Sequence, residues 1–239
     1  MIFRYLLIIL CGLSNVHAEE IKVAVGMSLP PYTIQEKNSG KELDIVMQAL
    51  TRAGYTMKPV YLPFGRISAA IHRGEVDAAM TVNEGMGIQD IFFSENHINY
   101  HNVAVTLSKY HFKIDRVEDM ASYSVVAFQN AKAYLGDAFK NMADHNAYYN
   151  EYAQQVQQNI MLYAERVQVV ISDRHIFDYY NKEAKQRGAN IDQNVTYHEI
   201  FPEIPYKVGF RQQVHRDAFN VALAQMRRDG SYSAIMKKY

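Results

Sequence analysis

Apolar and polar positions alternate along the first part of the chain in a way that predicts short strands and amphipathic helices. Three runs bounded by turn formers are typical of strands: Ile21–Val25, Met57–Leu62 and Val76–Val82. Between them, Leu43–Ala53 repeats apolar residues at helical spacing, and Ile67–His72 predicts a shorter helix. The order strand, helix, strand, helix, strand indicates a largely parallel sheet covered by helices.

The same kind of pattern restarts after an apolar strand at Val103–Leu107. The further strands are predicted at Ser124–Phe128, Val167–Ser172, Val195–Phe201 and Tyr206–Phe210, and the further helices at Ala131–Ala143, Gln154–Ala164, Arg174–Arg187 and Arg216–Arg228. We therefore expect two lobes, the first made of residues 19–108 and 206–239 and the second of residues 109–205. The chain is expected to cross between them near 108–110 and to return near 205–208.

The first 18 residues are typical of a secretory signal peptide. Arg4 precedes the apolar run Tyr5–Leu13, and Val16-His17-Ala18 supplies the cleavage positions. The apolar run is about nine residues long, whereas a membrane-spanning helix needs about 20. We expect the mature protein to begin near Glu19 and to reside in the periplasm.

Composition narrows the classes of partner. The single cysteine, Cys11, falls in the predicted signal peptide, so the mature chain would have no disulfide and must be held by its core. Setting Arg4 aside leaves 24 basic against 25 acidic residues. This balance argues against nucleic acid or an anionic membrane as the main partner.

A series of motifs gives the mature chain a family resemblance. In order they are "LPPYTI", "GKELDIVMQAL", "IHRGEVDAAMTV", "FFSENHINY", "VEDMASYSVVAFQNAKAYLG", "AERVQVVISDRHIFDYY" and "RRDGSYSAIMKKY". In this order and spacing the chain resembles the extracellular solute-binding proteins of family 3, the amino-acid-type substrate-binding proteins of bacterial ABC importers. The resemblance implies an α/β, two-lobed type II periplasmic binding protein fold, each lobe a mostly parallel sheet flanked by helices, closing on a small ligand.

The family's carboxylate clamp is altered in this chain. The resemblance implies an arginine shortly after the Val76–Val82 strand, where its guanidinium would pair with the ligand's α-carboxylate. Met86 stands at that position. Thr81, at the end of the strand, remains among the groups expected to line the site. In the second lobe, the family's Gly-Ser/Thr turn is replaced by Gln-Asn-Ala-Lys, so that Ala131 stands where a hydroxyl residue would assist.

The second lobe supplies three more candidate ligand contacts. The resemblance places an aspartate after the "VQVVIS" strand to accept from the ligand's amino group, and Asp173 falls there. The alternative is that Asp173 caps the helix that starts at Arg174. Gln129 and Asn130 lie nearest the start of the second-lobe helix, where each either contacts the ligand or serves the helix start.

The first lobe adds three candidates. Arg66 stands at a strand-to-helix junction, where it is a candidate substitute anion clamp or a plain surface arginine. Phe64 matches the position of an aromatic floor beneath the ligand, with core packing as the alternative. Tyr32 follows two prolines in the first loop and is a candidate lining residue.

The remaining polar clusters predict no further chemistry. Glu42 and Asp44 lie in a first helical turn, where acids complement the helix dipole. His97 and His101 have the spacing of a helical zinc pair but precede an apolar strand, so they would not share one face. We expect neither a metal site nor a cofactor.

The leading hypothesis is a non-enzymatic, monomeric periplasmic binding protein. It would capture a small polar ligand, amino-acid-like or amine-bearing, and present it to a membrane ABC permease. A membrane sensor that reads the same closure is an alternative partner. A dehydratase-like enzyme with Glu84 or Asp173 as acid or base is a weaker alternative, because the sequence contains no nucleophile–base or metal constellation.

Overall fold

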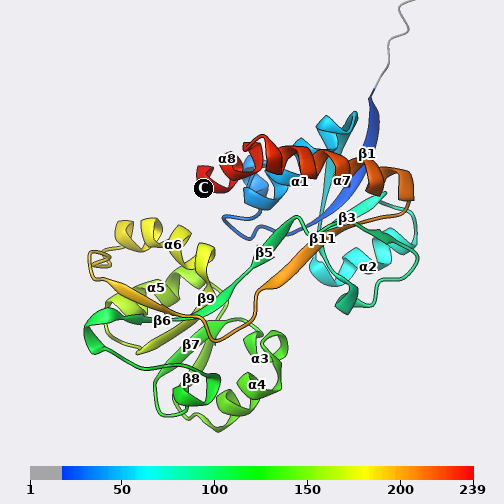
Figure 1. Ribbon diagram of the computed structural model, residues 1–239. Helices are drawn as coiled ribbons and strands as arrows, with labels where there is room; N and C mark the ends of the chain where they lie inside the picture. Colours follow the sequence, from blue (N-terminus) through cyan, green and yellow to red (C-terminus); the bar gives the residue numbers. More distant parts are fainter. Residues whose placement is uncertain (1–17) are drawn as a thin grey trace, which may run out of the picture.

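The computed structural model describes residues 18–239, so the signal peptide predicted for residues 1–18 lies almost wholly outside the described residues. Two bodies, each a sheet covered by helices, are connected by two extended segments of the chain, as Figure 1 shows. Within residues 18–239, no helix is long and apolar enough to cross a bilayer.

The first lobe is built on a sheet of strand order β2-β1-β3-β11-β4, with β5 paired to β11. Its strands are β1 (Glu19–Gly26), β2 (Tyr55–Leu62), β3 (Ala78–Val82), β4 (Phe92–Phe93), β5 (Ile98–Tyr100) and β11 (Ile204–Phe210), and its helices are α1 (Lys41–Arg52), α2 (Phe64–His72), α7 (Gln213–Arg228) and α8 (Ser231–Lys238). β1 pairs in parallel with β2 and β3, whereas β11 is antiparallel to its partners.

Side-chain alternation along β1 explains why both faces of this sheet are covered. Val23 and Val25 pack with residues of α1 and α7, whereas Ala24 packs with Ile67 and Ile71 of α2. Successive strand residues point to opposite faces, so a strand that is apolar throughout needs helices on both sides.

The second lobe has a five-stranded sheet of order β10-β6-β9-β7-β8. Its strands are β6 (Asn102–Leu107), β7 (Val125–Phe128), β8 (Tyr149–Tyr152), β9 (Val169–Asp173) and β10 (Val195–His198), and its helices are α3 (Ala131–Tyr134), α4 (Gly136–His145), α5 (Gln155–Tyr163) and α6 (Arg174–Gln186). The parallel pairs are β7/β8 and β7/β9, and antiparallel β6 and β10 complete the sheet. The predicted fold class, two α/β lobes with sheets flanked by helices, is confirmed.

The crossings between the sheets differ from the predicted positions. The strand at Val103–Leu107 was expected in the first lobe, but it pairs with β9 and β10 in the second sheet. The chain therefore passes between the sheets at His101, before β6, rather than at 108–110. It returns between β10 and β11, at residues 199–203, rather than at 205–208.

Three elements of the second lobe also differ from their predictions. The helix predicted at Ala131–Ala143 is broken into α3 and α4 at Gly136, whose φ of 85° lies in the left-handed region that favours glycine. The strand predicted at Val195–Phe201 ends at His198. β8 was not predicted, because its sequence, Tyr-Asn-Glu-Tyr, contains no aliphatic run.

The two lobes touch through the first turns of α6. Ile176 packs into the core of the first lobe, and Tyr180, one turn further along α6, packs against the same core. β5 and β11 run between the two bodies beside this contact (Figure 1). The start of α6 is therefore the place where relative movement of the lobes changes side-chain contacts.

Candidate ligand-binding site

Phe64 lies over the carboxyl end of β1. A Cβ atom added to Gly26, the last residue of β1, would fall 2.4 Å from the Cζ atom of Phe64, so a larger residue there would displace the ring. Phe64 opens α2 and is exposed on its other face. The ring is thus a partly exposed platform at the strand ends, where ligands bind in open α/β sheets.

Thr81 is held in an unusual backbone conformation at the end of β3. Its φ is 60°, a value that β-branched residues rarely adopt, and the register between β3 and β11 shifts at this point. The bulge directs the Thr81 hydroxyl toward Glu42, to which it donates at 2.8 Å. Thr81 is buried, and in this structure its hydroxyl serves an internal contact.

Glu42 is the centre of a buried polar cluster that sequence reasoning missed. Its side chain is fully buried and accepts hydrogen bonds from Thr81, from the Tyr100 hydroxyl at 2.7 Å and from a ring nitrogen of His97 at 2.8 Å. The sequence places Glu42 in a first helical turn, where acids commonly complement the helix dipole. That position alone does not distinguish a buried acceptor of three hydrogen bonds from an acid that only complements the dipole. Asp44, by contrast, accepts from the hydroxyl of Tyr239 near the chain's C-terminus.

Tyr32 and Asp173 join the two lobes. The Tyr32 hydroxyl lies 2.9 Å from each carboxylate oxygen of Asp173, and the Tyr32 ring stacks on Tyr100 with centroids 3.8 Å apart. Burial, followed by the negative charge of Asp173, raises the pKa of Tyr32 well above its usual value. Tyr32 therefore remains a hydroxyl donor across the physiological pH range.

Asp173 also caps α6. It accepts backbone N–H groups of His175 at 2.9 Å and Ile176 at 3.1 Å, and that of His101 at 2.8 Å. Burial raises the pKa of Asp173, while these hydrogen bonds lower it in part. Asp173 therefore serves as the cap of α6, and its role as a ligand contact stays a prediction.

A second polar contact between the lobes lies beside the first. The Nζ atom of Lys41, at the start of α1, is 3.1 Å from Nδ1 of His175. Burial lowers the pKa of both groups, and the positive charge of Lys41 lowers that of His175 further. The pair is therefore stable only while His175 is neutral.

The segment after β3 carries no free cation toward the strand ends. Met86, at the position where the family resemblance predicts an arginine, ends a short 3-10 turn and is exposed. Glu84 in the same turn is paired at 2.5 Å with Lys207 of β11, and this hydrogen bond lowers the pKa of Glu84.

Arg66 is exposed on α2, and its positive charge affects the pKa of Glu75, a residue beyond the other end of that helix. The pKa of Glu75, which follows α2, is lowered first by a hydrogen bond with Arg73 and to a smaller extent by Arg66. The guanidinium of Arg66 thus lies within electrostatic range of Glu75. Its proposed role as an anion clamp stays a prediction.

Gln129 and Asn130 form an exposed turn between β7 and α3. Asn130 has a φ of 66°, a left-handed conformation that asparagine tolerates, and its side chain makes no capping bond to α3. The backbone N–H of Asn130 donates instead to the carboxylate of Glu151 at 2.7 Å. Gln129 and Asn130 remain candidate ligand contacts through their side chains.

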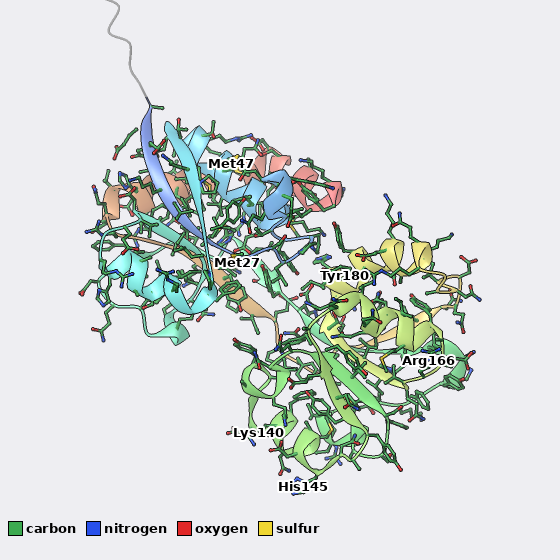
Figure 2. All side chains as sticks on the ribbon, turned by 180° about the vertical axis from the view of Figure 1, so that it is seen from behind. Met27, Met47, Lys140, His145, Arg166 and Tyr180 are labelled. Carbon is green, nitrogen blue, oxygen red and sulfur yellow. The ribbon has the colours of Figure 1, made fainter. Side chains whose placement is uncertain are left out.

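Large apolar side chains are exposed at the strand ends of both lobes. They are Met27 (47% exposed), Phe64 (45%), Met86 (47%) and, in α3 of the second lobe, Tyr134 (68%). Figure 2 shows Met27 at the edge of the first lobe that faces the second, with Tyr180 on the opposing edge. Exposed apolar groups at such a position favour binding of a ligand or closure of the lobes.

A cavity of about 410 Å³ lies between the lobes next to this edge. Ser28 and Leu29, just after β1, line one side. The other side is lined by residues 153–156 around the start of α5, by Tyr180 and Glu183 of α6, and by Arg187, which directly follows α6. A second cavity of about 470 Å³, lined by Arg174 and Arg227 among others, lies beside β5. Neither cavity is lined by any of the eight predicted site residues.

The histidines do not assemble a metal site among residues 18–239, where no group of three potential ligand side chains occurs. His97 is buried against Glu42, and β5 separates it from His101.

Comparison with known proteins identifies the family of the chain. A family model described as bacterial extracellular solute-binding proteins, family 3, matches residues 21–239. No curated protein matches the chain at the level of sequence.

Solved structures show the same architecture. An ancestral arginine-binding protein bound to arginine matches with a TM-score of 0.65 and 22% identity, over 93% of this chain and 99% of that one. A substrate-binding protein of an ABC uptake transporter from Streptococcus pneumoniae, with bound histidine, matches with a TM-score of 0.64 and 18% identity, over 92% of each chain. The ancestral amino-acid-binding protein AncCDT-1, described as a precursor of cyclohexadienyl dehydratase, matches with a TM-score of 0.65 and 18% identity, over 92% of this chain and 95% of that one. At these identities the likeness shows the fold.

Proposed function

The chain belongs to the bacterial extracellular solute-binding proteins, family 3, and on this premise we propose that it captures a small, polar, amine-bearing ligand between its two lobes. The proposed partner is a membrane ABC permease that recognises the closed form, and the proposed location is the periplasm, where the protein acts as a monomer. Family membership supports ligand binding outside the cytoplasm, and the features below support the site and the ligand class.

Both cavities are lined by residues of both lobes, and the observation that carries the proposal is the one that includes Ser28 and Ala153. Its volume of about 410 Å³ is in the range that holds small molecules. Ser28 and Ala153 follow the carboxyl ends of β1 and β8, which is where ligands bind in open α/β sheets. A ligand in this position contacts both lobes at once and therefore stabilises the closed arrangement over the open one.

Charge and aromatic groups at the strand ends favour an amine. Glu151 places a carboxylate there, Glu84 places a second one that is already paired with Lys207, and Met86 provides no positive charge for an anion. Phe64 and Tyr134 expose aromatic rings, whose faces attract cations. A ligand that presents an ammonium group is therefore better matched than one that presents only acids.

We also infer that the ligand is bound without chemical change. The fold alone does not decide this, because folds host several functions. The hydrogen bond from Lys207 lowers the pKa of Glu84, and the oxygens of Asp173 are occupied by Tyr32 and three backbone donors. Neither acid is placed to exchange a proton with a ligand.

A thermal-shift panel of amines, standard amino acids, small organic acids and sugars tests the proposal. A ligand at 100 times its Kd adds about 2.7 kcal/mol of stability, which raises Tm by roughly 5–10 °C in a chain of this size. We expect shifts with amines. Equal shifts with all standard amino acids would contradict the ligand class, and no shift with any compound would contradict the function.

A further inference from the structure

Glu151 occupies the backbone donors at the turn between β7 and α3. Its carboxylate accepts the N–H of Asn130 at 2.7 Å and that of Lys132 at 3.2 Å, and it accepts the Tyr149 hydroxyl at 2.8 Å. Three donors thus converge on one side chain. The protein itself supplies an anion to the donors of this turn.

The position of Glu151 follows from the sheet. β8 runs parallel to β7 with Glu151 opposite Ala127, so the side chain reaches past the end of β7 to the turn that follows it. Tyr149 and Glu151 are two residues apart on β8 and therefore point to the same face. The bond from Tyr149 holds the carboxylate against the turn.

The nearby cation does not cancel this charge. Lys132 donates its backbone N–H to Glu151, but its ammonium group is 3.1 Å from Asp144. In the first lobe Lys207 is likewise paired with Glu84, and the position of the family's arginine holds Met86. A ligand carboxylate beside the turn between β7 and α3 would therefore meet Glu151, and neither Lys132 nor Lys207 is free to pair with it.

We propose that Glu151 determines specificity by excluding a ligand α-carboxylate, so that the site takes amines that lack one. The inference rests on the proposed function and names the ligand class of the same site, because Glu151 lies two residues before Ala153, which lines the cavity. Two effects weaken the binding of a ligand carboxylate here. The N–H groups of Asn130 and Lys132 are already bonded to Glu151, and the negative charge of Glu151 repels a second carboxylate. An amine without a carboxylate does not need these N–H groups and is not repelled by Glu151.

Matched ligand pairs that differ by one carboxylate test this directly: agmatine and arginine, cadaverine and lysine, histamine and histidine, tyramine and tyrosine. Calorimetric Kd values are measured for the wild-type protein, for Glu151→Gln, and for Glu165→Gln. Glu165 is a control, because it is also a second-lobe glutamate that accepts from a tyrosine hydroxyl, that of Tyr110. It accepts in addition from the ammonium group of Lys109, and it lies between α5 and the start of β9, away from the carboxyl ends of the strands.

We expect the wild-type protein to bind at least one amine 10-fold or more tightly than its parent amino acid. Glu151→Gln is expected to reduce that ratio at least 10-fold by gaining affinity for the amino acid, whereas Glu165→Gln leaves it unchanged. If Glu151→Gln folds poorly, Tyr149→Phe, which removes the hydroxyl that holds the Glu151 carboxylate against the turn, is expected to reduce the ratio in the same direction by a smaller factor.

The outcomes separate the two proposals. Wild-type protein that binds an amino acid as tightly as its amine would overturn the role of Glu151 while leaving the binding function intact. An unchanged ratio in Glu151→Gln would overturn it as well. A wild-type protein that binds no member of any pair would count against the proposed function itself.

Discussion

The Tyr32 hydroxyl donates to the carboxylate of Asp173 across the gap between the two lobes, 2.9 Å from each oxygen and between residues 141 positions apart in the chain. Beside it, Lys41 of α1 meets His175 of α6. These two contacts, with Ile176 in the first-lobe core, fix the start of α6 against the first lobe. Any closure around a ligand must pivot about this contact or break it.

Removing the Tyr32 hydroxyl should weaken the link between the lobes without removing the aromatic stack. We expect Tyr32→Phe to lower the free energy of unfolding by about 1–2 kcal/mol, because a hydrogen bond to a charged acceptor is lost while three backbone donors still serve Asp173. Urea denaturation measures the change. Tyr61→Phe, which loses an exposed bond to Asn38, is the control and should cost less; equal losses would contradict the account.

Stability should fall as pH falls below neutrality. Burial lowers the pKa of His175 from its ordinary 6.5, so the unfolded chain binds a proton that the folded chain resists. The contribution of neutral His175 to the free energy of unfolding is fully present above pH 6.5 and is lost as pH falls toward the lowered pKa of the folded chain. Burial also lowers the pKa of His198, so protonation of His198 destabilises the folded chain in the same way. The raised pKa of Asp173 has the opposite effect: above pH 3.8 the folded chain holds a proton that the unfolded chain has lost, so this contribution to stability decreases as pH rises.

Comparison with His175→Gln isolates that residue's part in the pH dependence. The variant should show a shallower decrease in the free energy of unfolding between pH 7.5 and pH 5 than the wild-type protein. Identical slopes would show that His175 protonates as easily in the folded chain as in the unfolded one.

Glu42 should be among the costliest polar residues to change. Its fully buried carboxylate accepts from Thr81, His97 and Tyr100, and glutamine presents an NH₂ group to one of these donors. We expect Glu42→Gln to destabilise the protein by about 2–3 kcal/mol, the scale of a buried donor left unsatisfied. Exposed Glu118→Gln should stay within about 0.5 kcal/mol. Similar Tm values for both variants would disprove the role of the cluster.

Phe64 should matter for binding more than for folding. Phe64→Ala is expected to weaken binding of the tightest amine of the panel by about 10-fold or more, because a cation loses the face of an aromatic ring. Calorimetric titration measures the Kd. Phe92→Ala, which removes a similarly exposed ring from β4, should leave Kd within 2-fold. Comparable effects of the two changes would remove Phe64 from the site.

Local features of the sequence predicted local structure well. Helices α1, α5 and α6 begin and end within two residues of their predicted limits, because amphipathic periodicity and end signals such as Gly54 and Gly188 act within the segment itself. The family motifs also predicted the fold, which the family match and structural neighbours confirm.

Features that depend on distant pairing were not predictable. The apolar run at Val103–Leu107 predicted a strand, but its sheet depends on partners near residues 170 and 197. The bond between Thr81 and Glu42 joins residues 39 apart and depends on a bulge in β3. Glu151 lies in a strand without an aliphatic run; only the same-face spacing of Tyr149 and Glu151 hinted at its placement.

Small-angle X-ray scattering with and without ligand tests the central claim, that the two lobes close on a small amine. The radius of gyration is measured for the protein alone and with agmatine, cadaverine, histamine and tyramine in turn, each at a concentration that saturates its thermal shift. The radius of gyration is expected to be smaller with every amine that binds and unchanged with those that do not. An amine that binds tightly yet leaves the radius unchanged would contradict capture between the lobes.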